Sequence, residues 1–139
     1  MDRPDPFEPE ERERIARCCC GAIAVRVFGD PVLNGLCHCE DCRRRTGSAF
    51  GWSAYFPEDR VRGLHGKAAS YDPAAGTGTR HFCGTCGPTL YWRATGLREL
   101  VGIAGGAFVE PPLPAPTASY RDTQKCAWLD LPTEMKRKG

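Results

Sequence analysis

Eight of the nine cysteines in this 139-residue chain fall into three tight clusters of unequal composition. Clustered thiolates at such spacings are typical zinc ligands. Two pairs supply the four thiolates that close a tetrahedral structural site, whereas a triplet leaves one position open, as catalytic zinc sites do. The count therefore predicts two zinc ions per chain, one structural and one catalytic. The clusters are Cys18-Cys19-Cys20, then Cys37, Cys39 and Cys42, and finally Cys83 and Cys86.

The structural site is assigned to the two pairs. On a strand, residues i and i+2 share a face, so Cys18 and Cys20 would present their sulfurs together while Cys19 points away. The C-x-x-C of Cys83 and Cys86 is typical of a zinc knuckle, which supplies only two ligands. Since Cys18 and Cys20 form the other isolated pair, the sequence predicts a zinc ion that joins the start of the domain to its later half.

The triplet predicts the catalytic site. Cys37 and Cys39 would share a strand face, and a following turn would place Cys42 beside them. Three thiolates give a zinc ion a formal charge of −1, and such a centre is suited to accept an exogenous thiolate and keep it ionised. The alternative is that Cys126 or a histidine closes this site and makes it structural.

Three consecutive arginines, Arg43, Arg44 and Arg45, directly follow the triplet. Guanidinium groups pair well with carboxylates, so these residues are predicted to bind the carboxylates of a thiol ligand. His38 lies between two of the predicted ligands. We interpret it as a packing or hydrogen-bonding residue that points away from the metal.

The segments that must position these residues are predicted to be β-strands. Gly and Pro are plentiful, at 16 and 12, which is typical of a turn-rich β protein. Apolar alternation predicts strands at 23–28, 32–38 and 50–56, with further candidates at 67–71, 79–82, 89–93 and 100–104. Polar residues 40–45 predict one helical turn. We expect an all-β domain at residues 16–133, a flexible N-terminal tail at 1–15 and a C-terminal tail at 134–139.

Composition argues against several other classes of protein. The net charge is +2, from 19 basic and 17 acidic residues, and no long basic tract indicates nucleic-acid binding. No apolar stretch is long enough to span a membrane, and residues 1–17 lack the apolar segment of a signal peptide. We therefore expect a cytoplasmic protein. In that reducing compartment clustered cysteines more often bind metal than form disulfides.

Three sequence runs resemble the glutathione-dependent formaldehyde-activating enzyme family. The most specific is C-H-C-E-D-C-R-R-R-T-G-S-A-F at residues 37–50, flanked by C-C-C-G-A-I at 18–23 and R-H-F-C-G-T-C-G at 80–87. Trp128 and Leu129 are similar to the closing segment of that family. The resemblance spans roughly residues 16–130.

The resemblance implies a Mss4-like antiparallel β-sandwich with zinc knuckles. It implies a structural zinc on Cys18, Cys20, Cys83 and Cys86 and a second zinc on the triplet, where glutathione condenses with formaldehyde to S-hydroxymethylglutathione. The activity would be that of a carbon–sulfur lyase, and the partners a small-molecule thiol and an aldehyde. The alternative is a non-catalytic zinc-binding sandwich that acts as a protein-interaction or chaperone-like module, with four protein ligands on each zinc.

Overall fold

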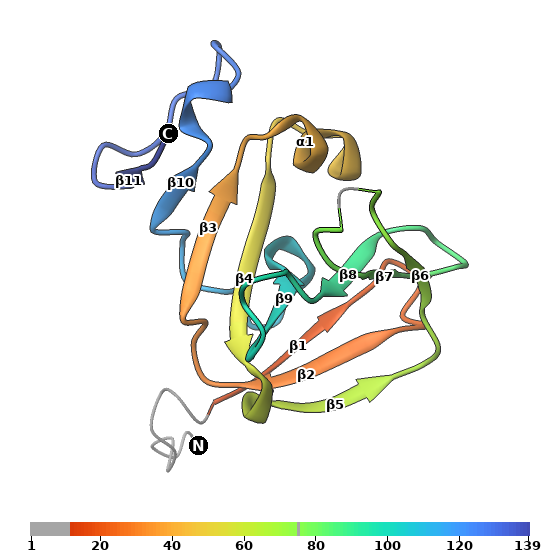
Figure 1. Ribbon diagram of the computed structural model, residues 1–139. Helices are drawn as coiled ribbons and strands as arrows, with labels where there is room; N and C mark the ends of the chain where they lie inside the picture. Colours follow the sequence, from red (N-terminus) through yellow and green to blue (C-terminus); the bar gives the residue numbers. More distant parts are fainter. Residues whose placement is uncertain (1–11, 75) are drawn as a thin grey trace.

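Two β-sheets packed face to face form most of the molecule (Figure 1). The computed structural model describes residues 12–74 and 76–139. The smaller sheet has the strand order β1-β2-β5, and the larger has the order β11-β10-β3-β4-β9-β8-β7-β6. This arrangement confirms the predicted all-β, Mss4-like fold class. Neighbouring strands are antiparallel except at β10, which runs parallel to both β3 and β11.

The strands are short, as expected for a chain rich in Gly and Pro. Strands of the smaller sheet are β1 (Glu13–Arg17), β2 (Ala24–Phe28) and β5 (Val61–His65). Strands of the larger sheet are β3 (Leu33–Cys37), β4 (Gly51–Pro57), β6 (Ala69–Tyr71), β7 (Arg80–Phe82), β8 (Thr89–Trp92), β9 (Leu100–Ala104), β10 (Ala118–Tyr120) and β11 (Lys136–Arg137). Single 3-10 turns are η2 (Glu58–Arg60), η3 (Gly105–Ala107) and η4 (Asp122–Gln124).

The core lies between the inward faces of the two sheets. Val25 and Val27 of β2 belong to the same buried cluster as Ala54, Phe56 and Ile103 of the larger sheet, and all five are fully buried. Ala54 and Phe56 thus occupy the core face that the alternation of β4 predicts. The other two apolar residues of that alternation differ from the prediction. Phe50 lies before the start of β4, and Trp52 is only half-buried.

One α-helix, α1 (Glu40–Thr46), follows β3 and lies at the end of the larger sheet beside β3 and β4 (Figure 1). The Cys39 side chain caps its first turn, and Gly47 ends it in the left-handed conformation. Acidic residues begin the helix and the three arginines end it, which complements the helix dipole. The predicted helical turn is therefore confirmed and slightly longer than expected.

Several short elements lie outside the predicted strands: β1, β5, β10 and β11. Most of the expected N-terminal tail, residues 1–15, lies outside the described residues, and its last three residues belong to β1. The expected C-terminal tail, residues 134–139, contains β11. Within the described ranges, no helix has the length and apolar character needed to cross a membrane.

Candidate functional site

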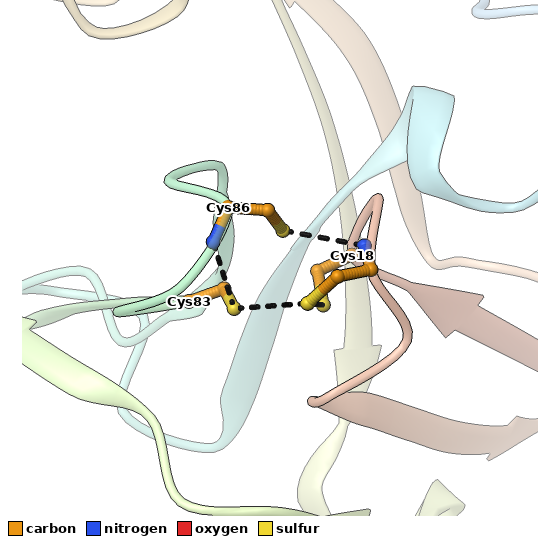
Figure 2. A group of neighbouring side chains, drawn as sticks. Cys18, Cys83 and Cys86 are labelled. Atoms are coloured by element: carbon orange, nitrogen blue, oxygen red, sulfur yellow. Dashed lines mark hydrogen bonds between the residues drawn. The ribbon is translucent and has the colours of Figure 1, made fainter.

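The two cysteine pairs meet at one point of the fold. Cys18 and Cys20 follow β1, and Cys83 and Cys86 lie on the turn between β7 and β8. Figure 2 shows Cys18 opposite Cys83 and Cys86. Their four sulfur atoms lie within 4.8 Å of one another. The Cys20 Sγ is 3.8 Å from that of Cys18 and 3.7 Å from that of Cys83. Four thiolates at such separations could hold one metal ion tetrahedrally.

Backbone N–H groups point at these sulfurs from both segments. Ile23 N donates to Cys18 Sγ at 3.3 Å, and Cys20 N donates to Cys86 Sγ at 3.4 Å. Hydrogen bonds from the N–H groups of Cys86 and then Thr85 lower the pKa of Cys83 to about 6. Such donors stabilise sulfur as thiolate, the form that binds metal.

The local geometry of the first pair differs from the strand expected for it. β1 ends at Arg17, and a turn closed by a hydrogen bond from Gly21 N to Cys18 O carries the pair. The turn, rather than the pleat of a strand, therefore brings Cys18 and Cys20 together. The four-sulfur group does not include Cys19.

The triplet forms where β3 passes into α1. Cys37 is the last residue of β3, Cys39 is the N-cap of the helix, and Cys42 lies in its first turn. The three sulfurs lie within 4.8 Å of one another, and all three residues are half-buried. Cys39 Sγ accepts a hydrogen bond from Cys42 N at 3.3 Å. Cys39 is thus placed by helix capping, and the expectation that it shares a strand face with Cys37 is wrong.

Cys37 and Cys42 interact directly through their side chains. A hydrogen bond from the Cys42 thiol lowers the pKa of Cys37, and the same bond raises the pKa of Cys42. Neither Cys126 nor a histidine in the described ranges joins the group. Of the histidines, His81 stacks on Tyr91, with ring centroids 4.6 Å apart. Among the described residues, the group therefore consists of three sulfurs without a fourth cysteine, histidine or carboxylate donor.

His38 is fully buried and turned towards the C-terminal segment. Its Nε2 lies 2.8 Å from the Ser119 Oγ, which donates to the Asp122 Oδ1 at 2.6 Å. Because the serine proton goes to the carboxylate, Nε2–H must be the donor to Ser119. The Nε of Arg137, a residue of β11, donates a hydrogen bond to the Asp122 Oδ1 at 2.7 Å. The interpretation of His38 as a hydrogen-bonding residue agrees with this chain of contacts.

The three arginines diverge, because consecutive helical residues point in different directions. Arg45 turns back over the sheet, with its guanidinium carbon 4.9 Å from the centroid of the Trp92 ring. Arg43 and Arg44 lie on the outer side of α1, where Arg44 is 4.0 Å from Glu40. The Arg45 guanidinium also lies over Gly51, beside the Cys42 Cβ.

A cavity of about 790 Å³ lies between α1, β1 and the first cysteine cluster. Its apolar lining includes Phe50, Trp52, Leu90 and Val109. Its charged lining is Arg17, Arg45 and Glu110. Arg45 belongs to the same helix as Cys42, but the lining cysteines are Cys18 and Cys19 of the first cluster and include no member of the triplet.

Sequence reasoning missed a second set of residues around the triplet. Tyr55 and Trp92 lie on the same sheet face as Cys37, and Ser119 and Asp122 support His38. Tyr55 had a detectable signal, since it alternates with the apolar core residues Ala54 and Phe56 of β4 and so lies on the opposite face. The second pair lies more than 80 residues from His38, and local patterns carry no signal for it.

Comparison with known proteins identifies a family and related solved structures. The sequence model of a family described as glutathione-dependent formaldehyde-activating enzyme matches residues 13–123. A crystal structure of a Rhodobacter sphaeroides protein is similar, with a TM-score of 0.55 and 23% sequence identity, over 67% of this chain and 85% of that chain. At this identity the similarity concerns the fold alone. Among curated proteins, no sequence matches the chain.

Proposed function

Because the chain belongs to the glutathione-dependent formaldehyde-activating enzyme family, we propose that it condenses glutathione, or a related thiol, with formaldehyde or another small aldehyde. The product with formaldehyde is S-hydroxymethylglutathione, and in the reverse sense the enzyme is a carbon–sulfur lyase. The observation that carries the proposal is the group of three sulfurs of Cys37, Cys39 and Cys42, with the Arg45 guanidinium and the Cys42 Cβ both lying over Gly51. We assign the domain to residues 13–137, because β1 and β11 pair within the two sheets, and its location to the cytoplasm.

Both cysteine groups fit zinc by the chemistry of their donors. The four sulfurs of Cys18, Cys20, Cys83 and Cys86 match a closed structural site, and two segments distant in sequence supply them. The triplet supplies three sulfurs, which matches a site with one open position. Zinc held by the triplet would accept the sulfur of the substrate as a fourth ligand and keep it ionised at neutral pH.

The chain's own charged side chains suit the remainder of a glutathione molecule. Glutathione has two carboxylates and one ammonium group, and the cavity beside α1 offers Arg17, Arg45 and Glu110. Arginine binds carboxylates through a planar pair of donors, and Glu110 complements an ammonium group. Among the three arginines predicted to bind the thiol, Arg45 is therefore assigned this contact, while Arg43 and Arg44 remain predicted contacts at the outer side of the helix.

The bond changes are those of a thiol addition. The ionised sulfur attacks the carbonyl carbon, a sulfur–carbon bond forms, and the electron pair of the carbonyl π bond moves to oxygen. The thiol proton, released to water on ionisation, is replaced by a proton from water on that oxygen. Holding both reactants beside the triplet lowers the entropic cost of their meeting.

Replacement of a single triplet cysteine tests the proposal. Cys39→Ser should reduce the zinc content from two ions per chain to one and abolish both glutathione binding in isothermal titration and catalysed adduct formation. Cys126→Ser is the matched control, because Cys126 belongs to neither cluster, and it should behave as wild type. Adduct formation at the wild-type rate by C39S would contradict the proposal. Four protein ligands on both zincs would favour the interaction module instead.

A further inference from the structure

The triplet lies on one face of the larger sheet, together with residues from three other strands. In the observed register Cys37 pairs with Gly51, Tyr55 with Gly102, and Gly102 with Trp92. Directly paired residues share a face, and so do residues i, i+2 and i+4 of one strand. Cys37, Gly51, Tyr55 and Trp92 therefore lie on the same face, opposite the apolar core.

Glycines on this face allow larger side chains to lie flat against the sheet. The Arg45 guanidinium lies where a side chain at Gly51 would project, and the Cys42 Cβ lies beside the same point. The Trp92 indole occupies the corresponding space over Gly102. Because Arg45 also covers the Trp92 ring, these side chains form one continuous layer that starts at the triplet.

Tyr55 completes that layer. The Trp92 Nε1 lies 3.1 Å from the Tyr55 hydroxyl, and the two rings meet edge to face with centroids 6.3 Å apart. An indole N–H can only donate, so the Tyr55 oxygen accepts this bond and its own proton remains available. Within residues 12–74 and 76–139, no recorded hydrogen bond takes up that proton. The phenol is thus fixed in position with a free donor.

The electrostatic surroundings of Tyr55 link it to the sulfurs. Burial raises the pKa of the Tyr55 phenol, and the hydrogen bond from Trp92 opposes that rise. The charges of Cys42 and Cys37 raise the pKa further, while that of Arg45 lowers it. The phenol therefore keeps its proton at neutral pH.

We propose that Tyr55 is a catalytic hydrogen-bond donor to the aldehyde oxygen. This role rests on the proposed function, because it concerns the carbonyl that the substrate sulfur attacks. When the sulfur–carbon bond forms, negative charge develops on that oxygen, and a fixed donor in a partly desolvated site stabilises it. Tyr55 keeps its own proton throughout, and water supplies the proton that ends on the product hydroxyl. The bond from Trp92 fixes the hydroxyl so that it need not reorient during the reaction.

Tyr55→Phe isolates this role, because it removes only the hydroxyl and keeps the ring. Tyr91→Phe is the matched control: Tyr91 lies in β8 next to Trp92, and its side chain points to the other face of the sheet. We expect Y55F to lower the kcat for adduct formation and decomposition about 100-fold, the scale of losing one oxyanion donor. The KM for glutathione and the zinc content should stay close to those of wild type. The melting temperature should fall by a few degrees, because the Trp92 indole N–H loses its acceptor. Y91F should retain the wild-type kcat.

A binding measurement provides a readout independent of turnover. Y55F should bind S-hydroxymethylglutathione about fivefold to tenfold more weakly relative to glutathione than wild type does, since one hydrogen bond is worth about that factor. An unchanged kcat and an unchanged affinity ratio in Y55F would overturn the role of Tyr55 and leave the proposed function standing. A wild-type chain that accelerates neither direction of the reaction would overturn both.

Discussion

Ser119→Ala should destabilise the protein by about 3 kcal/mol. Ser119 and His38 are both fully buried, and the serine hydroxyl is at once the acceptor for His38 and a donor to Asp122. The chain of contacts ties β10 to the loop that carries Cys37 and Cys39. Alanine would fill most of the space of serine, so the effect isolates the hydroxyl.

The magnitude follows from what each group loses. Each of the two hydrogen bonds contributes about 1 kcal/mol net, and a buried donor left without a partner adds about 1–3 kcal/mol. Without Ser119, the Nε2–H of His38 loses the acceptor that it has in the native structure. The expected total of about 3 kcal/mol corresponds to a fall in the melting temperature of about 10 °C for a domain of this size.

Urea denaturation of the zinc-loaded protein measures this difference. Ser70→Ala is the matched control, because Ser70 is an exposed serine at the centre of β6, and it should change the free energy of unfolding by less than about 0.5 kcal/mol. If the free energy of unfolding of S119A stays within about 0.5 kcal/mol of the wild-type value, the contacts of Ser119 do not stabilise the segment from Cys37 to Cys39 in the way that the geometry indicates.

Three further predictions concern the sheet face, the structural cluster and pH. Gly102→Ala should lower the free energy of unfolding by about 3 kcal/mol in urea denaturation, because its Cβ would collide with the buried Trp92 ring. Gly51→Ala should lower it by about 1 kcal/mol or less, because mainly the flexible end of a guanidinium must move. Equal losses would contradict this reasoning. Cys83→Ser should leave one zinc ion per chain in metal analysis. It should also lower the melting temperature sharply, since a structural zinc contributes on the order of 10 kcal/mol to folding. Retention of two zinc ions would refute the four-cysteine site. The hydrogen bonds from Arg137 and then Ser119 lower the pKa of Asp122 from its ordinary 3.8. Its contribution is therefore complete above pH 3.8 and is lost only as the pH falls through the lower folded value. The difference in unfolding free energy between wild type and Asp122→Asn should accordingly stay constant from pH 8 to pH 5, and a difference that shrinks within that range would show another titrating group.

Much of the fold could be predicted where local alternation is strong. Phe56 and Ala54 alternate with polar neighbours, and β4 buries both. β5 was missed because it is an edge strand of the smaller sheet whose residues are exposed or half-buried, so its sequence lacks a buried face. β10 was missed because three residues are too few for a period to show, and its parallel pairing with β3 depends on contacts across more than 80 residues.

The candidate site divides in the same way. The spacing of Cys83 and Cys86 predicts a metal-binding turn, because two residues between the cysteines suffice to bring both sulfurs to one ion. The number of ligands that a structural zinc needs predicts that Cys18 and Cys20 lie beside this turn. The fold places the four sulfurs together. Cys39 shows the limit of the pattern, since the start of α1 rather than strand pleating orients its side chain.

The sequence by itself determined the three cysteine groups and the metal chemistry that they favour, because ligand type and spacing act over a few residues. Only the tertiary structure decided which side chains surround those groups. Arg45, Trp92 and Tyr55 come from one helix and two strands, and the sheet register together with the glycines beneath them brings them into one layer. Register depends on pairing between distant segments, so no local pattern encodes the neighbours of the triplet.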